Sequence, residues 1–170
     1  MSLNNIKIKF PPLRELLKKK TIKHYFGKFL GLRATPHNLA WSVAIGVFIG
    51  FLIPIGFQTF FIIPLAAVLE VNLIVAYLST LVSNPITAIP MYYVAVELGK
   101  SITGINVAWS NFETLFSAPS WDALMNLGSE SIIVFFTGSF ILGVVFAILL
   151  YFTTLKLVTY YRKLHNIQLH

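Results

Sequence analysis

The sequence has no cysteine, and it has very few charged side chains for its length of 170 residues. Without cysteine, disulfides, thiolate metal sites and cysteine nucleophiles are excluded. Charged residues make up 11% of the chain, whereas a soluble domain carries roughly 25%. Between Arg33 and Glu97 the only Asp, Glu, Lys or Arg side chain is Glu70. With 56% hydrophobic residues, this composition indicates an integral membrane protein.

The charged residues that are present lie mostly at the two ends. Residues 1–33 hold nine basic side chains and one acid, Glu15; the basic ones are Lys7, Lys9, Arg14, Lys18, Lys19, Lys20, Lys23, Lys28 and Arg33. The tail after Leu155 has three basic residues and no acid, whereas the loop about 100–130 is acidic. The positive-inside rule therefore predicts a multi-pass protein of the cytoplasmic (inner) membrane, with both termini cytoplasmic and that loop external. The partners expected at the basic flanks are anionic lipids, and not nucleic acid.

Three regions follow from this distribution. Residues 1–33 form a basic cytoplasmic flank whose apolar residues between 22 and 30 have helical spacing, which is typical of a helix lying in the headgroup plane. The alternative is a flank that only sets the orientation. Residues 34–160 form the membrane domain, and 161–170 are a basic C-terminal tail.

Proline interrupts two adjacent apolar segments of the membrane domain. Thr35 and Pro36 predict a capped helix start, and this helix should run to the break at 54–56 and be followed by a second arm, 57–69. The next pair of arms, 71–82 and 86–98, flanks the break at 83–85. Residues 131–155 carry no charge and are long enough to cross a membrane. The predicted fold class is all-α: an integral membrane protein with two broken or re-entrant helical segments and a C-terminal transmembrane helix.

The two breaks are the candidate functional site. Unwound backbone at membrane depth must be buried in protein or line a wet cavity, and paired interrupted segments indicate a transporter-type binding site. The alternative is two kinked helices that shape a bundle and bind nothing. We expect the helix to stop near Asn84, with the Asn84 side chain pointing inward. The candidate substrate-binding residues are Gln58, Thr59, Glu70, Asn84, Pro85 and Thr87.

Spacing suggests that the two segments form an internal repeat. Pro64 and Glu70 follow Gln58 at intervals of six; Pro90 follows Asn84 at six, and Glu97 follows Pro90 at seven. Glu70 is either a proton or cation site inside the membrane or a surface residue in a turn between the segments. Tryptophan and tyrosine residues suit interfacial belts; these are Trp41, Trp109, Trp121, Tyr92 and Tyr93. A short helix is also expected after Ser120, ending before Gly128.

Three stretches together resemble the domain of unknown function 2062 family of prokaryotic membrane proteins: "TPHNLAWSVAIGVFIGFLIPIGFQT", "VNLIVAYLSTLVSNPITAIPMYY" and "TGSFILGVVFAILLYFTTL". The chain departs from the family at Pro54, a single proline where members often have two. Some members are fused to sugar-transferase domains, which implies work on lipid-linked intermediates. The residues expected to shape the motifs are Pro36, Gly46, Gly50, Pro54, Gly56, Pro64, Asn72, Pro90, Gly138 and Gly143; Gly46 and Gly50 form a small-xxx-small pair that lets another helix approach closely.

The function predicted from these features is a transporter or channel-like protein. It would move or gate a small or lipid-linked substrate through a cavity at the two breaks. The alternative is a non-transporting membrane subunit or scaffold that organises enzymes of lipid-linked sugar metabolism. No nucleophile–base pair or phosphate loop is found, and the four histidines have no metal-ligand spacing. We therefore expect no enzyme activity, no cofactor and no metal site, and we expect a homo-oligomer.

Overall fold

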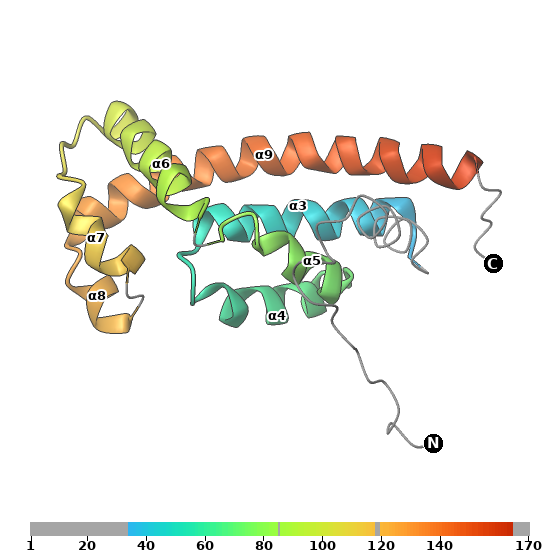
Figure 1. Cartoon of the computed structure of the whole chain (residues 1–170), viewed down its shortest axis with the longest axis horizontal. Coiled ribbons are helices and arrows are strands. Elements are labelled where there is room, and N and C mark those ends of the chain that lie inside the picture. Colours follow the sequence, from blue (N-terminus) through green and yellow to red (C-terminus); the bar gives the residue numbers. More distant parts are fainter. Residues whose placement is uncertain (1–33, 85, 118–119, 165–170) are drawn as a thin grey trace, which may run out of the picture. The chain divides into compact units, whose positions relative to one another are not determined.

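The computed structural model describes residues 34–84, 86–117 and 120–164, and their regular structure is helical throughout (Figure 1). The helices are α3 (Pro36–Leu52), α4 (Gln58–Val68), α5 (Leu73–Thr80), α6 (Ala88–Thr103), α7 (Ser110–Ser117), α8 (Trp121–Met125) and α9 (Ser129–Leu164). The all-α prediction is confirmed. The helix expected between 22 and 30 lies outside the described residues. Contacts divide the chain into two units, and one of them, Ala34–Thr159, contains both breaks and the helix packing around them.

Two predicted helix starts are confirmed by their capping bonds. The Thr35 hydroxyl accepts a hydrogen bond from the Asn38 N–H at 3.1 Å, with Pro36 at the first position of α3. Ser120 does the same for α8, accepting from the Ala123 N–H at 3.1 Å. Each cap gives a partner to a backbone donor that the first helical turn leaves free.

Among the described helices, α9 alone is long and apolar enough to cross a membrane by length and composition. Its 36 residues include the uncharged run predicted from the sequence. Large apolar side chains along it are about half exposed; they include Phe140, Val145, Ile148, Leu149 and Phe152. α3 and α4 are also apolar but shorter.

α3 lies between α9 on one side and the α4–α5 pair on the other (Figure 1). Phe48 of α3 packs edge-on against Phe140 of α9, with ring centroids 5.7 Å apart. Phe51 stacks on Phe146 at 5.0 Å. Helices α3, α4 and α5 contact one another on the opposite side. Helix α3 therefore packs against α9 on one side and against α4 and α5 on the other.

Glycines bring the helix backbones close together at two crossings. A Cβ atom on Gly46 would overlap the Ala76 carbonyl of α5, and one on Gly50 would lie 3.0 Å from the Thr80 carbonyl oxygen. At the second crossing, a Cβ on Gly138 of α9 would overlap the Ala95 carbonyl of α6. The absence of a side chain is what allows these approaches, as expected of small residues between membrane helices.

The arms around the two breaks differ in length, so the segments are not equivalent repeats. The arms have 17 and 11 residues around the first break, and 8 and 16 around the second. Pro64 lies inside α4, whereas Pro90 lies in the first turn of α6, where a missing N–H costs no hydrogen bond. The equal spacing of Pro64 and Pro90 in the sequence therefore does not give the two prolines equivalent positions in their helices.

We expect Gly46→Ala to destabilise the protein by about 1–3 kcal/mol, because the new methyl group must push α5 away from α3. Thermal unfolding of the purified protein in detergent, followed by circular dichroism, measures the change. Gly143→Ala is the matched control. Its Cβ would meet the Phe48 ring edge at 3.1 Å, and that side chain can move; its other contacts, with the Phe48 carbonyl oxygen and the Phe51 Cβ at 3.4 Å, are ordinary van der Waals distances. Equal melting temperatures for the two variants would contradict the close α3–α5 contact.

Candidate functional site

The first break is a tight turn between α3 and α4. The last helical bond runs from the Ile53 N–H to the Ile49 carbonyl at 2.9 Å, and the Phe57 N–H then donates to the Pro54 carbonyl at 3.2 Å. Gly56 has a φ of 96°, a left-handed conformation that glycine adopts without steric cost. The turn leaves the carbonyls at the end of α3 without helical partners.

The second break, between α5 and α6, is held together by its own side chains. The Asn84 Oδ1 accepts hydrogen bonds from the N–H groups of Ile86 and Thr87, at 2.9 and 3.2 Å. The Thr87 hydroxyl donates to the Val82 carbonyl at 2.5 Å. Local bonds of this kind let the backbone leave the helix without losing its partners.

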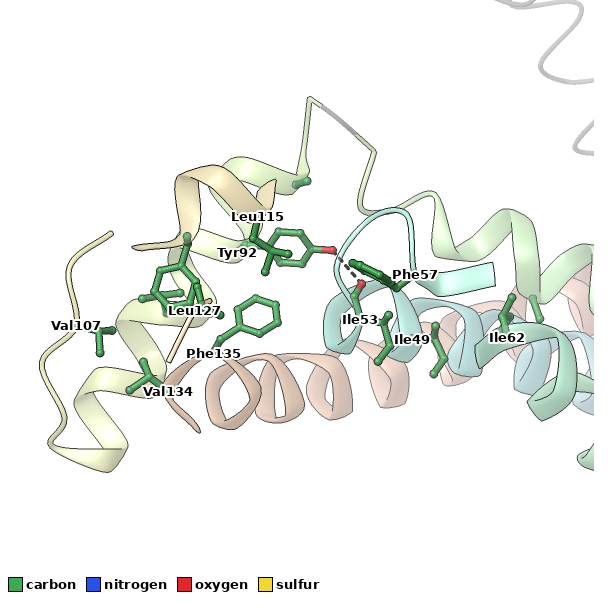
Figure 2. Packing of buried hydrophobic residues seen from close by; sticks show 14 of the residues in the cluster. Ile49, Ile53, Phe57, Ile62, Tyr92, Val107, Leu115, Leu127, Val134 and Phe135 are labelled. Carbon is green, nitrogen blue, oxygen red and sulfur yellow. Dashed lines mark hydrogen bonds between the residues drawn. The ribbon is translucent and has the colours of Figure 1, made fainter. Parts of the chain in front are cut away.

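The two breaks meet at a cluster that we call the polar junction: Gln58, Ser83 and Tyr92 with the carbonyls of Gly50 and Ile53. The Gln58 Nε2 donates to the Ser83 Oγ at 2.6 Å and to the Ile53 carbonyl at 3.0 Å, and it lies 3.4 Å from the Gly50 carbonyl. The Tyr92 hydroxyl donates to the Ile53 and Gly50 carbonyls at 3.1 and 3.3 Å. Figure 2 shows the Tyr92 hydroxyl reaching Ile53.

The polar junction is buried. Gln58 is 8% exposed, Ser83 2% and Tyr92 1%. Beside it the Tyr92 ring stacks on Phe116 at 4.7 Å and packs edge-on against Phe135 at 5.4 Å. Because Gln58 and Tyr92 donate into the same carbonyls, these donors are used within the protein and leave little for a ligand.

Most of the candidate residues lie outside the polar junction. Thr59 and Thr87 are exposed, Asn84 is half-buried in its own loop, and Pro85 lies outside the described residues. Gln58 is thus the one described candidate that is fully buried and connects both breaks. Its partner across them is Ser83, and not the amide of Asn84.

Tyr92 lies in a different environment from the one that its residue type predicts. A position in an interfacial belt is expected for Tyr92. It is instead buried near the end of α3, and its hydroxyl donates to the Gly50 and Ile53 carbonyls. A signal for burial is present in the sequence: Ala88, Tyr92, Ala95 and Gly99 follow one another at helical spacing, and all are buried. Tyr93, the next residue, is 47% exposed, and its interfacial position stays a prediction.

Glu70 lies in the loop between α4 and α5. This loop packs beside the first two helical turns of α3. The Asn38 Nδ2 donates to the Glu70 carbonyl at 2.8 Å, and the Asn72 N–H donates to the Ser42 Oγ at 2.9 Å. Glu70 is exposed and has a φ of 52°, which suits a sharp surface turn better than a buried cation site. In the part of the chain described, no three His, Asp or Glu residues are placed to hold a metal ion.

The sequence from residue 19 to 166 matches the model of a family described as "Uncharacterized protein conserved in bacteria (DUF2062)". The chain belongs to this family. The DUF2062 match includes both breaks and the polar junction between them. Comparisons with curated proteins and with solved structures gave no match. The family description states no activity, so for this DUF2062 chain a function must be argued from the junction and the surfaces around it.

We expect Gln58→Leu and Tyr92→Phe to destabilise the protein more together than the sum of their separate effects. Either residue alone can still donate to the Ile53 and Gly50 carbonyls, whereas the double variant leaves both buried carbonyls without that donor. The excess should be about 0.5–3 kcal/mol, measured by unfolding in detergent. Tyr93→Phe on the exposed side of α6 is the control. Additive effects would show that the two side chains act independently.

Proposed function

We propose that the chain is a multi-pass protein of the cytoplasmic membrane in which α3 and α4 form a re-entrant hairpin. The hydrogen bonds from Asn38 to Glu70 and from Asn72 to Ser42 support this, because they bring the end of α4 back to the start of α3. The 11 residues of α4 reach about 16 Å at 1.5 Å per residue. This is short of a hydrocarbon core of about 30 Å. The α5–α6 segment and α9 would then be the two crossings.

Exposed apolar side chains on the α4–α5 pair support the membrane placement. The exposed large residues of this pair are Phe60, Phe61, Ile63, Val68, Leu69, Leu73, Ile74, Tyr77 and Leu78. A soluble monomer rarely exposes so continuous an apolar surface. In a membrane the same surface faces lipid or another subunit.

For the activity, we propose the non-transporting alternative. The chain acts as a static membrane subunit that organises enzymes acting on lipid-linked sugars, the class of partner that the family resemblance implies. The observation that carries the static role is the polar junction: the side chains that join the two breaks are buried and hydrogen-bonded to each other. Opening a conduit there would leave several buried polar groups unpaired, at about 1–3 kcal/mol each.

A conduit for a small or lipid-linked substrate is the second candidate. The observation in its favour is that two discontinuous segments meet, with the Gln58 Nε2 2.6 Å from the Ser83 Oγ. Transporters place binding sites where interrupted helices lie together at mid-membrane. The two candidates differ in whether water reaches the junction.

Thiol labelling at the junction separates these two functions, and the absence of native cysteine gives a clean background. We expect Ser83→Cys to resist a membrane-permeant maleimide in intact membranes, because a thiol needs water to form its reactive thiolate. Glu70→Cys, in the exposed turn, is the reactive control. Rapid labelling of Ser83→Cys would indicate a wet cavity and would select the conduit.

The partner class is tested with a photo-crosslinking amino acid in place of Phe60, which is 69% exposed on α4. In cells, the static-subunit proposal expects one enriched product containing a sugar-transferring membrane enzyme. The same crosslinker at Val145, 55% exposed on α9, is the control for random collisions. Products containing only lipid, or identical products at both positions, would overturn the partner assignment.

The topology makes a separate prediction. Single cysteines at Glu70 and Met125 should be labelled by an impermeant maleimide from opposite sides: Met125→Cys in whole cells, and Glu70→Cys only in inside-out vesicles. The reason is that Glu70 lies beside the start of α3, the helix that follows the basic flank in the sequence, whereas Met125 lies in the acidic loop. Labelling of Glu70→Cys from outside would rule out the re-entrant hairpin.

A further inference from the structure

Two apolar grooves open on either side of Trp41, near the start of α3. The first, of about 290 Å³, lies between α3 and the α4–α5 turn and is lined by Asn38, Trp41, Ile45, Leu69 and Val71. The second, of about 300 Å³, lies between α3 and α9 and is lined by Trp41, Ala44, Ala147, Ile148, Tyr151 and Phe152. Trp41 is the one side chain that lines both grooves.

Trp41 forms a ridge between the grooves. Its side chain is 53% exposed, and its ring packs against Tyr151 with centroids 5.0 Å apart. The second groove continues onto the exposed apolar side chains of α9, Ile148 and Phe152. A molecule with two apolar chains could therefore place one chain on each side of this ridge.

Polar groups lie at one end of both grooves, one helical turn before Trp41. The Tyr151 hydroxyl lies 2.9 Å from the His37 Nδ1, a hydrogen-bond distance. The Asn38 Nδ2 uses one of its two hydrogens on the Glu70 carbonyl, which leaves the second for another acceptor. Imidazole, hydroxyl and amide groups at the mouth of apolar grooves match the junction between a lipid headgroup and its acyl chains.

The charges around this end favour an anionic headgroup. Lys156 is exposed on α9, five residues after Tyr151. The first turn of α3 has no acidic residue. Glu70 is the one acid near the first groove among the described residues, and its carbonyl, not its carboxylate, is bonded to Asn38.

We propose that this surface binds one anionic two-chain phospholipid. Its acyl chains straddle Trp41, one in each groove, and its phosphate accepts hydrogen bonds from the second Asn38 Nδ2 hydrogen and from whichever of His37 and Tyr151 keeps a free hydrogen in their shared bond. This site rests on the proposed membrane placement. It goes further by giving a lipid class and a defined position to a chain whose sequence indicates only general attraction to anionic lipid.

The test uses Trp41 itself as the reporter. In the full chain carrying Trp109→Phe and Trp121→Phe, Trp41 is the sole tryptophan. The protein is placed in phosphatidylcholine nanodiscs that contain a minor, equal fraction of brominated phosphatidylglycerol or brominated phosphatidylcholine. Bromine quenches tryptophan only at short range. We expect phosphatidylglycerol to be preferred at the quenching site by about tenfold, which corresponds to about 1.4 kcal/mol.

Two sets of variants separate the headgroup from the chains. His37→Gln with Tyr151→Phe should remove the preference for phosphatidylglycerol while leaving quenching by bulk lipid intact. We expect native mass spectrometry to show phosphatidylglycerol retained on the wild-type protein, and Ala147→Phe should fill the second groove and abolish that retention. Val145→Phe, which adds a similar ring to α9 outside the groove lining, is the control. If Ala147→Phe fails to fold, the His37 and Tyr151 pair decides the question.

The outcomes also distinguish the site from the membrane placement. Equal quenching by the two brominated lipids, with no phosphatidylglycerol retained in the mass spectrum, overturns the lipid site and leaves the placement standing. A neutral phospholipid retained in its place overturns the headgroup assignment. Absence of quenching by either lipid overturns the placement and the site together.

Discussion

The backbone carbonyls at the end of α3 are the constraint on which the rest of this fold depends. Gly50 and Ile53 lie in an apolar environment where the helix stops, so their oxygens must find donors within the protein. The chain next to these carbonyls, at the end of α3 and in the turn that follows it, has almost no polar side chains. The donors come instead from Gln58, at the start of α4, and from Tyr92, in the second turn of α6. A requirement of one helix end thereby fixes the positions of two other helices.

Close helix packing follows from this arrangement. For Gln58 to reach both the end of α3 and Ser83, α5 must approach α3 closely enough to bring the second break alongside the first. Gly46 and Gly50 permit that approach, because neither carries a side chain between the two backbones. The polar junction and the glycine contacts therefore support each other. Short α4 and α5, which are too brief to be stable alone in water, depend on both.

The sequence predicted local structure well and the long-range pairing poorly. The start of α3 followed from Thr35 and Pro36, whose preferences act over a single turn. The break after Thr80 followed from residues 83–85 for the same reason. That Gln58 pairs with Ser83 depends instead on how α5 lies on α3, which local preferences do not determine. The Asn84 side chain, a candidate binding residue at the second break, instead accepts hydrogen bonds from the Ile86 and Thr87 N–H groups of its own loop.

The same contrast applies to Tyr92 and Tyr93. Adjacent tyrosines point to different sides of a helix, so at most one could face the interface; the small residues one turn on either side of Tyr92 mark the buried face. Burial gives the Tyr92 hydroxyl a structural role, as a second donor, beside Gln58, to the Gly50 and Ile53 carbonyls.

The two ends of α3 differ in a way that bears on function. At its C-terminal end the polar groups are buried and paired within the chain, and the neighbouring space is filled by aromatic side chains. At its N-terminal end, grooves stay open around Trp41 and polar groups remain available at their mouth. A conduit through the breaks needs the closed end to open, at the cost of several buried hydrogen bonds. Binding at the other end needs no such rearrangement. The lower cost favours a ligand-accessible surface along the flank of this chain, which faces lipid in the proposed membrane placement.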